Sequence, residues 1–267
     1  MILLTGTTGY LGGHVAKKFE QKGIVHAQLQ STRLQPWRLR DELNLEQIGR
    51  SEAIIHFAWQ REWSKNDPYP NVRSVGTLSS VAARMGSRFV FISSYAALAG
   101  QSHYAREKRL AEAITLENQG TVVRVGLVWG GKEGGSLGLL RNWSTRGLPW
   151  ILPSHDVYVH LTHIDDLAKG LTGILDLKPG TLHHWAFPKP YAVEDIWNHA
   201  SAGIERRPRA LRIPGKIVTA VLSINKASKR LRVSADSAQG LLMTSMTEPL
   251  LIGTRAFRGL GEVIDEW

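Results

Sequence analysis

A tyrosine and a lysine stand four residues apart in the stretch "SHYAREKRLAEA", as Tyr104 and Lys108. The stretch is rich in helix-forming residues, and side chains four apart project from the same face of a helix. A lysine ammonium beside a phenol stabilises the phenolate and lowers the pKa of the tyrosine. Tyr104 is therefore a candidate general acid and base, and Lys108 is the group that would tune it.

Two serines precede this helix at the end of an apolar run. The run "RFVFISS" predicts a buried strand that ends in Ser93 and Ser94. Open α/β sheets bind ligands at the carboxyl ends of their strands, where a hydroxyl can hydrogen-bond a reacting oxygen. Ser94 is the preferred candidate, and Ser93 stays open.

The chain begins "MILLTGTTGYLGGHVAKKFE", which predicts a strand over about 1–5, a glycine turn and a helix over about 11–21. The spacing G-x-x-G-x-x-G permits a tight turn, close approach to a pyrophosphate and close packing of helix on strand. The helix N-terminus adds N–H groups and a positive dipole end for the phosphates. The alternative is a simple turn. The expected dinucleotide contacts are Gly6, Thr7, Thr8, Gly9, Tyr10, Leu11 and Gly12.

The end of the second predicted strand, over about 24–29, indicates which dinucleotide binds. NAD sites usually place an acid there for the ribose hydroxyls, but no acid occurs from Gly23 to Arg40. Ser31 and Arg33 instead offer a hydroxyl and a guanidinium, which suit a 2′-phosphate. The alternative is a solvent-facing loop. The sequence thus favours NADP, with NAD second.

Strands and helices alternate along the first two thirds of the chain. Apolar runs at 53–58, 88–94 and 120–130 alternate with helical stretches at 72–85 and 104–118. This pattern predicts an α/β fold with a Rossmann-type, doubly wound parallel sheet. We expect a dinucleotide-binding domain over 1–176, with an inserted loop at about 131–156, and a smaller C-terminal substrate lobe over 177–267.

Several motifs in the right order resemble the extended short-chain dehydrogenase/reductases, the NAD(P)-dependent sugar-nucleotide epimerase/dehydratase family. They cover roughly the first 170 residues: "TGTTGYLG", "IIHFAW", "NVRSVGT", "FISS", "YAREK", "RVGLVWG" and "HIDDLAKGL". The resemblance implies further cofactor contacts at Phe57, Ala58, Trp59, Asn71, Ser93 and Lys108.

The resemblance also implies roles for the candidate site. Tyr104 would transfer a proton to or from a substrate oxygen, Lys108 would hold the nicotinamide ribose, and Ser94 would polarise the same oxygen. Hydride would pass between the substrate carbon and the nicotinamide. The family also suggests a homodimer.

Departures from the family pattern narrow the function. The Asp-Glu pair of family dehydratases is missing after Ser94, and the stretch from Ser94 to Tyr104 is shorter than a sugar-nucleotide epimerase would have. Leu127 stands where the family has asparagine. We therefore expect an NADP-dependent oxidoreductase that acts on a nucleotide-sugar-like carbonyl or hydroxyl. The alternatives are an epimerase that uses the same three residues and a non-catalytic NADP-binding regulator or scaffold.

Composition constrains partners and compartment. The chain has 267 residues, no cysteine and a formal net charge of +10. Basic residues concentrate at 206–232, where they would attract an anion such as a nucleotide substrate, nucleic acid or an acidic membrane surface, unless they form only a solvated basic face. No interleaved aromatic residues for base stacking accompany them, so an anionic small-molecule substrate is expected and nucleic acid is not. Without cysteine there can be no disulfide or thiolate metal site. No apolar run is long enough to span a membrane and no secretory segment opens the chain, so a cytoplasmic location is expected.

Three other features are read as structural. The histidines His155, His160, His163 and the pair His183-His184 lack the companion ligands of a zinc site, so no metal is expected. The pair Asp165-Asp166 suits a helix start. The stretch 213–232 could be an amphipathic helix on a membrane surface, but a helix packed within the C-terminal lobe is favoured.

Overall fold

The computed structural model describes most of the chain. The described residues are 1–33, 35–39, 41–60, 67, 69–100, 102–131, 144–147, 150–154, 156–202, 204, 209–214 and 257–259. Most of the predicted loop at 131–156 and of the basic segment at 206–232, as well as His155 and nearly all of the predicted helix 213–232, lie outside these ranges. No helix among the described residues is long and apolar enough to cross a membrane.

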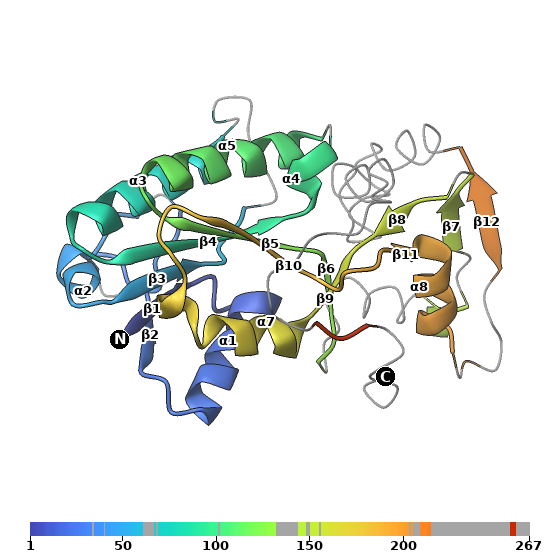
Figure 1. Ribbon diagram of the computed structural model, residues 1–267, viewed down its shortest axis with the longest axis horizontal. Coiled ribbons are helices and arrows are strands. Elements are labelled where there is room, and N and C mark those ends of the chain that lie inside the picture. Colours follow the sequence, from blue (N-terminus) through green and yellow to red (C-terminus); the bar gives the residue numbers. More distant parts are fainter. Residues whose placement is uncertain are drawn as a thin grey trace. The chain divides into compact units, whose positions relative to one another are not determined.

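A parallel sheet of six strands confirms the predicted fold class (Figure 1). Its order is β10-β5-β4-β3-β1-β2, and every neighbouring pair is parallel. The strands are β1 (Ile2–Thr5), β2 (His26–Gln28), β3 (Ala53–His56), β4 (Arg88–Ser94), β5 (Thr121–Val125) and β10 (Leu182–Trp185). All residues of β1 and β3 are buried, as expected where helices cover both faces of a parallel sheet.

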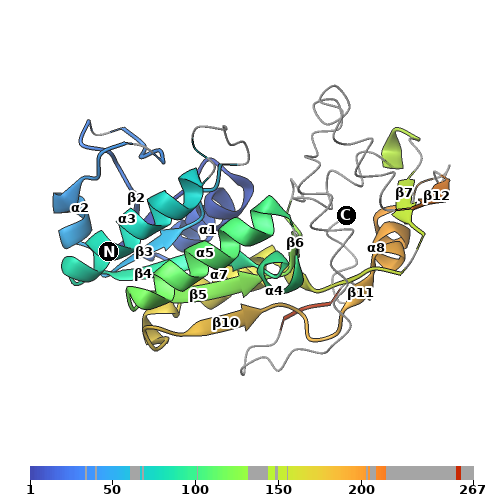
Figure 2. The ribbon, with the colours of Figure 1, turned by 90° about the horizontal axis from the view of Figure 1, so that it is seen from above.

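Helices cover both faces of this sheet. Figure 1 shows α3 (Pro70–Arg84) and α5 (His103–Glu117) on one face, and α1 (Tyr10–Gln21) and α7 (Ile164–Leu171) on the other. Figure 2 shows α3 and α5 side by side, and Asn118 donates to Ser79 where they meet. A short helix, α2 (Leu45–Gly49), follows β2. The main core lies between the sheet and α3, with Leu3, Ile54, Phe91 and Leu78 fully buried.

The predicted strand over 120–130 is divided in two at Gly126. The N–H of Gly126 donates to the hydroxyl of Thr162, and a Cβ at Gly126 would lie 2.2 Å from the carbonyl oxygen of His160. The chain therefore leaves β5 and enters a separate strand, β6 (Leu127–Trp129), which pairs in parallel with β9 (Leu161–His163). His163 thus lies on a strand.

The chain forms two compact units whose boundaries differ from the predicted 1–176 and 177–267. One unit is Met1–Ser94, Glu107–Val125 and Ile164–Trp185, and the other is Tyr95–Arg106, Gly126–His163 and Ala186–Trp267. The first unit includes β10, because that strand pairs with β5. The predicted substrate role of the C-terminal part stays a prediction.

The second unit has its own small core. It holds the β6–β9 pair, β7 (Trp150–Pro153) beside β12 (Ala210–Ile213), and β8 (Tyr158–Val159) beside β11 (Tyr191–Ala192). Helix α8 (Val193–Ala200) follows β11, and α4 (Ala96–Ala99) precedes α5; the short turn η1 (Ile174–Asp176) belongs to the first unit. The core residues include Trp129, Leu161 and Ile196.

Candidate functional site

The glycine loop has no room for side chains at two of its glycines. Gly6 has a φ of +69°, and a Cβ there would lie 2.7 Å from the backbone nitrogen of Ala58. A Cβ on Gly12 would lie 2.4 Å from the carbonyl oxygen of Gly6. The loop is therefore held against both the end of β3 and the start of α1, and only glycine fits at these positions.

The same loop leaves the positive end of α1 uncompensated by the chain. Among the described residues no side chain caps α1 at Gly9, and its first turn contains no acid. Thr8 and Gly9 are exposed, and Thr7, Tyr10 and Leu11 are half-buried. A backbone cradle before a helix N-terminus fits a pyrophosphate, so the residues present suit the dinucleotide that the sequence predicts. Their individual contacts with it stay predictions.

A hydrogen-bonded pair, Thr5 and His56, joins this loop to the end of β3. The hydroxyl of Thr5 accepts hydrogen bonds from the backbone nitrogens of Phe57 and Ala58, both at 3.2 Å. Its own proton is donated to Nδ1 of His56, 2.9 Å away. Burial, and next the charge of Lys108, lower the pKa of His56 to about 3, so the ring is neutral and carries its proton on Nε2. Phe57 and Ala58 are thereby fixed beside Gly6.

The ammonium of Lys108 is buried in an aromatic setting. Its Nζ donates to the carbonyl oxygen of Ile92 at 3.0 Å and lies 3.7 Å from the ring centroid of Trp59. The Phe91 ring is 4.6 Å away. Burial lowers the pKa of Lys108 to about 7, although the carboxylates of Glu112 and Glu107 act in the opposite direction. A lysine with such a pKa is a group tuned for chemistry near neutral pH.

Asn71 holds the loop that carries Trp59. Its Oδ1 accepts from the backbone nitrogen of Gln60 at 2.7 Å, and its Nδ2 donates to the carbonyl oxygen of Gln60 at 2.9 Å. The same Nδ2 donates to Glu107, which is buried beside Lys108. The amide of Asn71 thus makes three structural hydrogen bonds. Its predicted cofactor contact stays a prediction.

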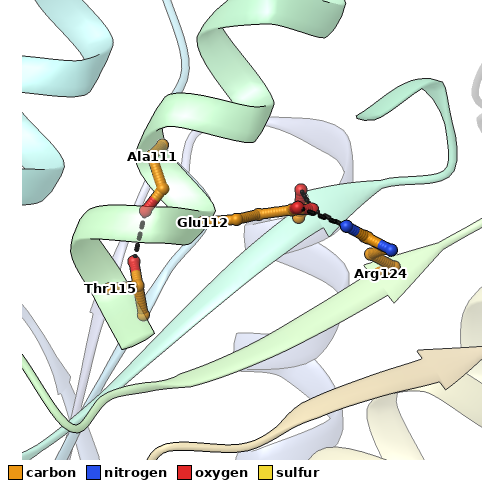
Figure 3. Close-up of polar contacts among 5 residues, drawn as sticks. Ala111, Glu112, Thr115 and Arg124 are labelled. Atoms are coloured by element: carbon orange, nitrogen blue, oxygen red, sulfur yellow. Dashed lines mark hydrogen bonds and ion pairs between the residues drawn. The ribbon is translucent and has the colours of Figure 1, made fainter. Parts of the chain in front are cut away.

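Ser93 joins a buried ion pair by its hydrogen bond to Glu112 of α5, and Figure 3 shows Glu112 reaching across to Arg124 of β5. The Ser93 hydroxyl donates to Glu112 at 2.5 Å, and Glu112 receives two hydrogen bonds from Arg124 of β5, at 2.9 and 2.6 Å. Adjacent strand residues point to opposite faces, so Ser94 lies on the other side of β4. The Ser93 hydroxyl is therefore bound to Glu112, and the choice of Ser94 over Ser93 for contact with a reacting oxygen stays a prediction.

Ser94 and Tyr104 lie where strand and helix geometry put them. Ser94 is the last residue of β4 and is half-buried. Ser102 caps α5, since its hydroxyl accepts from the backbone nitrogen of Ala105 at 3.1 Å. Tyr104 is half-buried in the first turn of this helix, one turn before Lys108. The catalytic roles of all three residues stay predictions.

The turn at 31–33 brings in an acid that the sequence argument left out. The backbone nitrogen of Thr32 donates to the carbonyl oxygen of Glu42, and the Thr32 hydroxyl donates to the carboxylate of Glu42 at 3.3 Å. Ser31 is buried and Arg33 is exposed. The stretch without an acid ends at Arg40, and Glu42 lies just beyond it. An antiparallel bridge between Ser31 and Leu43 brings Glu42 back to the turn.

Three other polar residues singled out in the sequence, His160, His163 and Asp165, have partners in the structure. Nδ1 of His160 lies 2.9 Å from the carbonyl oxygen of Phe187, and Nδ1 of His163 lies 2.8 Å from the Arg258 guanidinium. Asp165 lies in the first turn of α7, where its carboxylate binds His14 at 2.8 Å and Lys18 at 2.9 Å. It joins α7 to α1.

Sequence reasoning missed the residues that surround Lys108. Glu112 could have been found from helical spacing, because it follows Lys108 by four residues as Lys108 follows Tyr104. Arg124 and His56 carry no local signal, because each meets its partner only when the strands assemble.

A comparison with known protein families finds one match. Residues 2–121 match the sequence profile of a family described as "NAD dependent epimerase/dehydratase family". No curated protein matches the chain significantly.

Solved structures similar to the chain share its fold. The crystal structure of gox2253 has a TM-score of 0.69 at 17% identity and covers 100% of this chain and 96% of its own. UDP-glucose 4-epimerase from Thermotoga maritima, solved with UDP-glucose, has a TM-score of 0.65 at 17% identity and covers 90% and 96%. The enzyme WbmH from Bordetella bronchiseptica, solved with NAD+, has a TM-score of 0.67 at 13% identity and covers 99% and 96%.

Proposed function

We propose, from the match of residues 2–121 to the NAD-dependent epimerase/dehydratase family, that the chain is an NADP-dependent oxidoreductase acting on a carbonyl or hydroxyl of a nucleotide-sugar-like substrate. The observation that carries this proposal is the buried ammonium of Lys108, one helical turn after Tyr104. A positive charge in that position would stabilise the phenolate of a tyrosine that acts as acid and base.

The chain's own residues would divide the work as follows. The backbone of Gly6, Gly9 and Gly12 would bind the pyrophosphate, and Lys108 would hold the nicotinamide ribose. When bound, the dinucleotide would supply or accept the hydride. Tyr104 would exchange a proton with the substrate oxygen, with its phenolate stabilised by the Lys108 charge, and Ser94 would donate a hydrogen bond to the same oxygen.

A nucleotide sugar is the substrate class that the surroundings favour. The Thermotoga maritima relative was solved with UDP-glucose, and the net charge of +10 would attract an anionic substrate. Arg212 lies in the basic segment, but it already pairs with Glu194 and Asp156. The other arginines of that segment are the proposed phosphate ligands. A homodimer and a cytoplasmic location are further parts of this proposal.

Two variants of this function have specific support. Glu42 beside the 31–33 turn suits ribose hydroxyls better than a 2′-phosphate, so NAD is the alternative cofactor. The similar UDP-glucose 4-epimerase makes sugar epimerisation the alternative reaction. An epimerase would need the same tyrosine, lysine and serine.

Calorimetric titration with NADPH and then with NADH tests the cofactor. We expect NADPH to bind more tightly than NADH. Arg33→Ala should remove this preference, because the guanidinium that pairs with the 2′-phosphate is lost. Glu42→Gln should increase it, because a carboxylate repels a 2′-phosphate. Tighter binding of NADH would refute the NADP assignment. If neither dinucleotide binds, the proposal that the protein is a dinucleotide-dependent enzyme is refuted.

The reaction is tested next with UDP-sugars. Conversion of one NADP+ to NADPH, or of one NADPH to NADP+, for each substrate molecule consumed would indicate an oxidoreductase. Isomerisation of the sugar without net oxidation or reduction of the dinucleotide would indicate an epimerase. Tyr104→Phe should remove turnover in either case while leaving dinucleotide binding in place. Turnover that survives Tyr104→Phe would contradict the assigned role.

A further inference from the structure

The indole of Trp59 covers a charge that the protein has otherwise buried. Lys108 has a side chain only 5% exposed, and its Nζ lies 3.7 Å from the Trp59 ring centroid. A cation over the face of an indole is attracted by the negative potential of the ring, and this attraction strengthens when water is excluded. Trp59 itself is half-buried.

The position of the indole is itself fixed from two sides. Its ring lies 5.8 Å from the Phe91 ring, tilted by 32°. The next residue, Gln60, is held at both its backbone nitrogen and its carbonyl by the amide of Asn71. Asn71 in turn donates to Glu107, the neighbour of Lys108 on α5. The loop that carries the indole is therefore tied to the helix that carries the lysine.

Lysine needs such a device more than most residues do. Its ammonium sits on a flexible four-carbon stem, and it hydrates strongly. A hydrogen bond to the carbonyl oxygen of Ile92, at 3.0 Å, holds Nζ on one side. The rings of Trp59 and Phe91 contact it on another. An ammonium that could swing into water would no longer present its charge at a constant place along α5.

We propose that Trp59 is a positioning residue: its indole holds the ammonium of Lys108 by a cation–π contact and keeps water away from it. The proposal rests on the proposed function in that the held charge is the one that serves the dinucleotide and Tyr104. In the part of the chain that the structure describes, the ionisable groups that act on Lys108 include Glu107 and Glu112 from α5 and His56 from β3, and Tyr104 lies one helical turn before it. None of them covers the ammonium in the way that Trp59 does.

The direct test observes Lys108 by NMR in protein labelled with ¹³C and ¹⁵N in lysine, and Lys108→Arg identifies its signal. In the unaltered protein the ε-methylene protons should be shifted upfield by the indole ring, and the amine should titrate near pH 7. In Trp59→Ala the ring shift should disappear and the titration should move up by about one pH unit or more, because burial is the main cause of the low value. Trp59→Phe keeps an aromatic face and should stay close to the unaltered protein.

The positioning role of Trp59 and the proposed function are tested by different measurements, so one can fail without the other. An ordinary ε-methylene shift in the unaltered protein, or a Lys108 titration that Trp59→Ala leaves unchanged, would overturn the positioning role whether or not a dinucleotide binds. The first of these does not depend on Trp59→Ala, so it holds even if that variant fails to fold. Calorimetry with NADPH and NADH on the unaltered protein tests the function instead. If either binds, Trp59→Ala should weaken it about fivefold, and Trp59→Phe should weaken it less.

Discussion

Replacement of Lys108 by methionine should change how the stability of the protein depends on pH. The pKa of Lys108 falls from 10.5 to about 7 because the ammonium is buried, and the difference of about 3.5 pH units corresponds to about 5 kcal/mol. The charged form is the one that the fold disfavours. The cost is therefore fully present below about pH 7 and disappears as the pH rises toward 10.5, where the amine is neutral in both states. Between these values the unfolded chain keeps the proton and the folded chain has lost it, so stability rises with pH.

Urea unfolding at several pH values from 6 to 9 measures this effect. At pH 6 Lys108→Met should be more stable than the unaltered protein by up to about 5 kcal/mol, and above pH 7 the advantage should shrink by about 1.4 kcal/mol for each pH unit. Methionine fills a similar volume beside Trp59 and Phe91 without a charge. Lys17→Met, at an exposed position of α1, controls for loss of a surface lysine. A difference between Lys108→Met and the unaltered protein that stays constant from pH 6 to 9 would show that Lys108 titrates alike in both states, which would refute the reasoning.

Three further predictions follow from the contacts around the site. Thr5→Val should destabilise the fold by about 2 kcal/mol, because it leaves two N–H groups and a histidine nitrogen without their partner; thermal unfolding should show that Thr5→Ser, which keeps the hydroxyl, does not. Gly12→Ala should weaken dinucleotide binding at least tenfold in calorimetry, since its Cβ would lie 2.4 Å from a carbonyl oxygen, whereas Gly76→Ala meets nothing closer than 3.5 Å and should bind normally. Glu112→Gln should cost about 3 kcal/mol in urea unfolding, because it leaves the Arg124 guanidinium buried without its counter-charge; a loss below 1 kcal/mol would mean that the pair behaves like a surface pair.

Much of the fold was predictable because its signals are local. The run "MILLTG", the apolar run at 53–58 and the helix that begins near Tyr104 each carry their period within a few residues. The order of these elements then restricts the topology, since parallel strands need helical crossovers. The predicted strand at 24–29 proved shorter, because β2 includes only His26–Gln28.

The side-chain environment of the site could not be predicted in the same way. The position of Lys108 beside Tyr104 follows from helical spacing, but its cover by Trp59 depends on a loop that leaves β3 almost fifty residues earlier. The contact between Thr32 and Glu42 depends on a bridge between Ser31 and Leu43, which no periodicity announces. Interactions of this kind are decided when distant segments pack, and a sequence pattern reports only the segments.

Two carboxylates beside Lys108, those of Glu107 and Glu112, favour its charged form and offset part of the cost of its burial. Glu112 accepts two hydrogen bonds from Arg124, and Glu107 accepts one from the uncharged amide of Asn71. Both carboxylates act to raise the pKa of Lys108, Glu112 more than Glu107. Replacing Glu107 by glutamine should consequently lower the pKa of Lys108 further and weaken the hold of the site on a cation, whereas replacing Arg124 should leave Glu112 in excess and raise it. Opposite shifts of the Lys108 pKa in these two variants are expected only if both carboxylates act on the lysine.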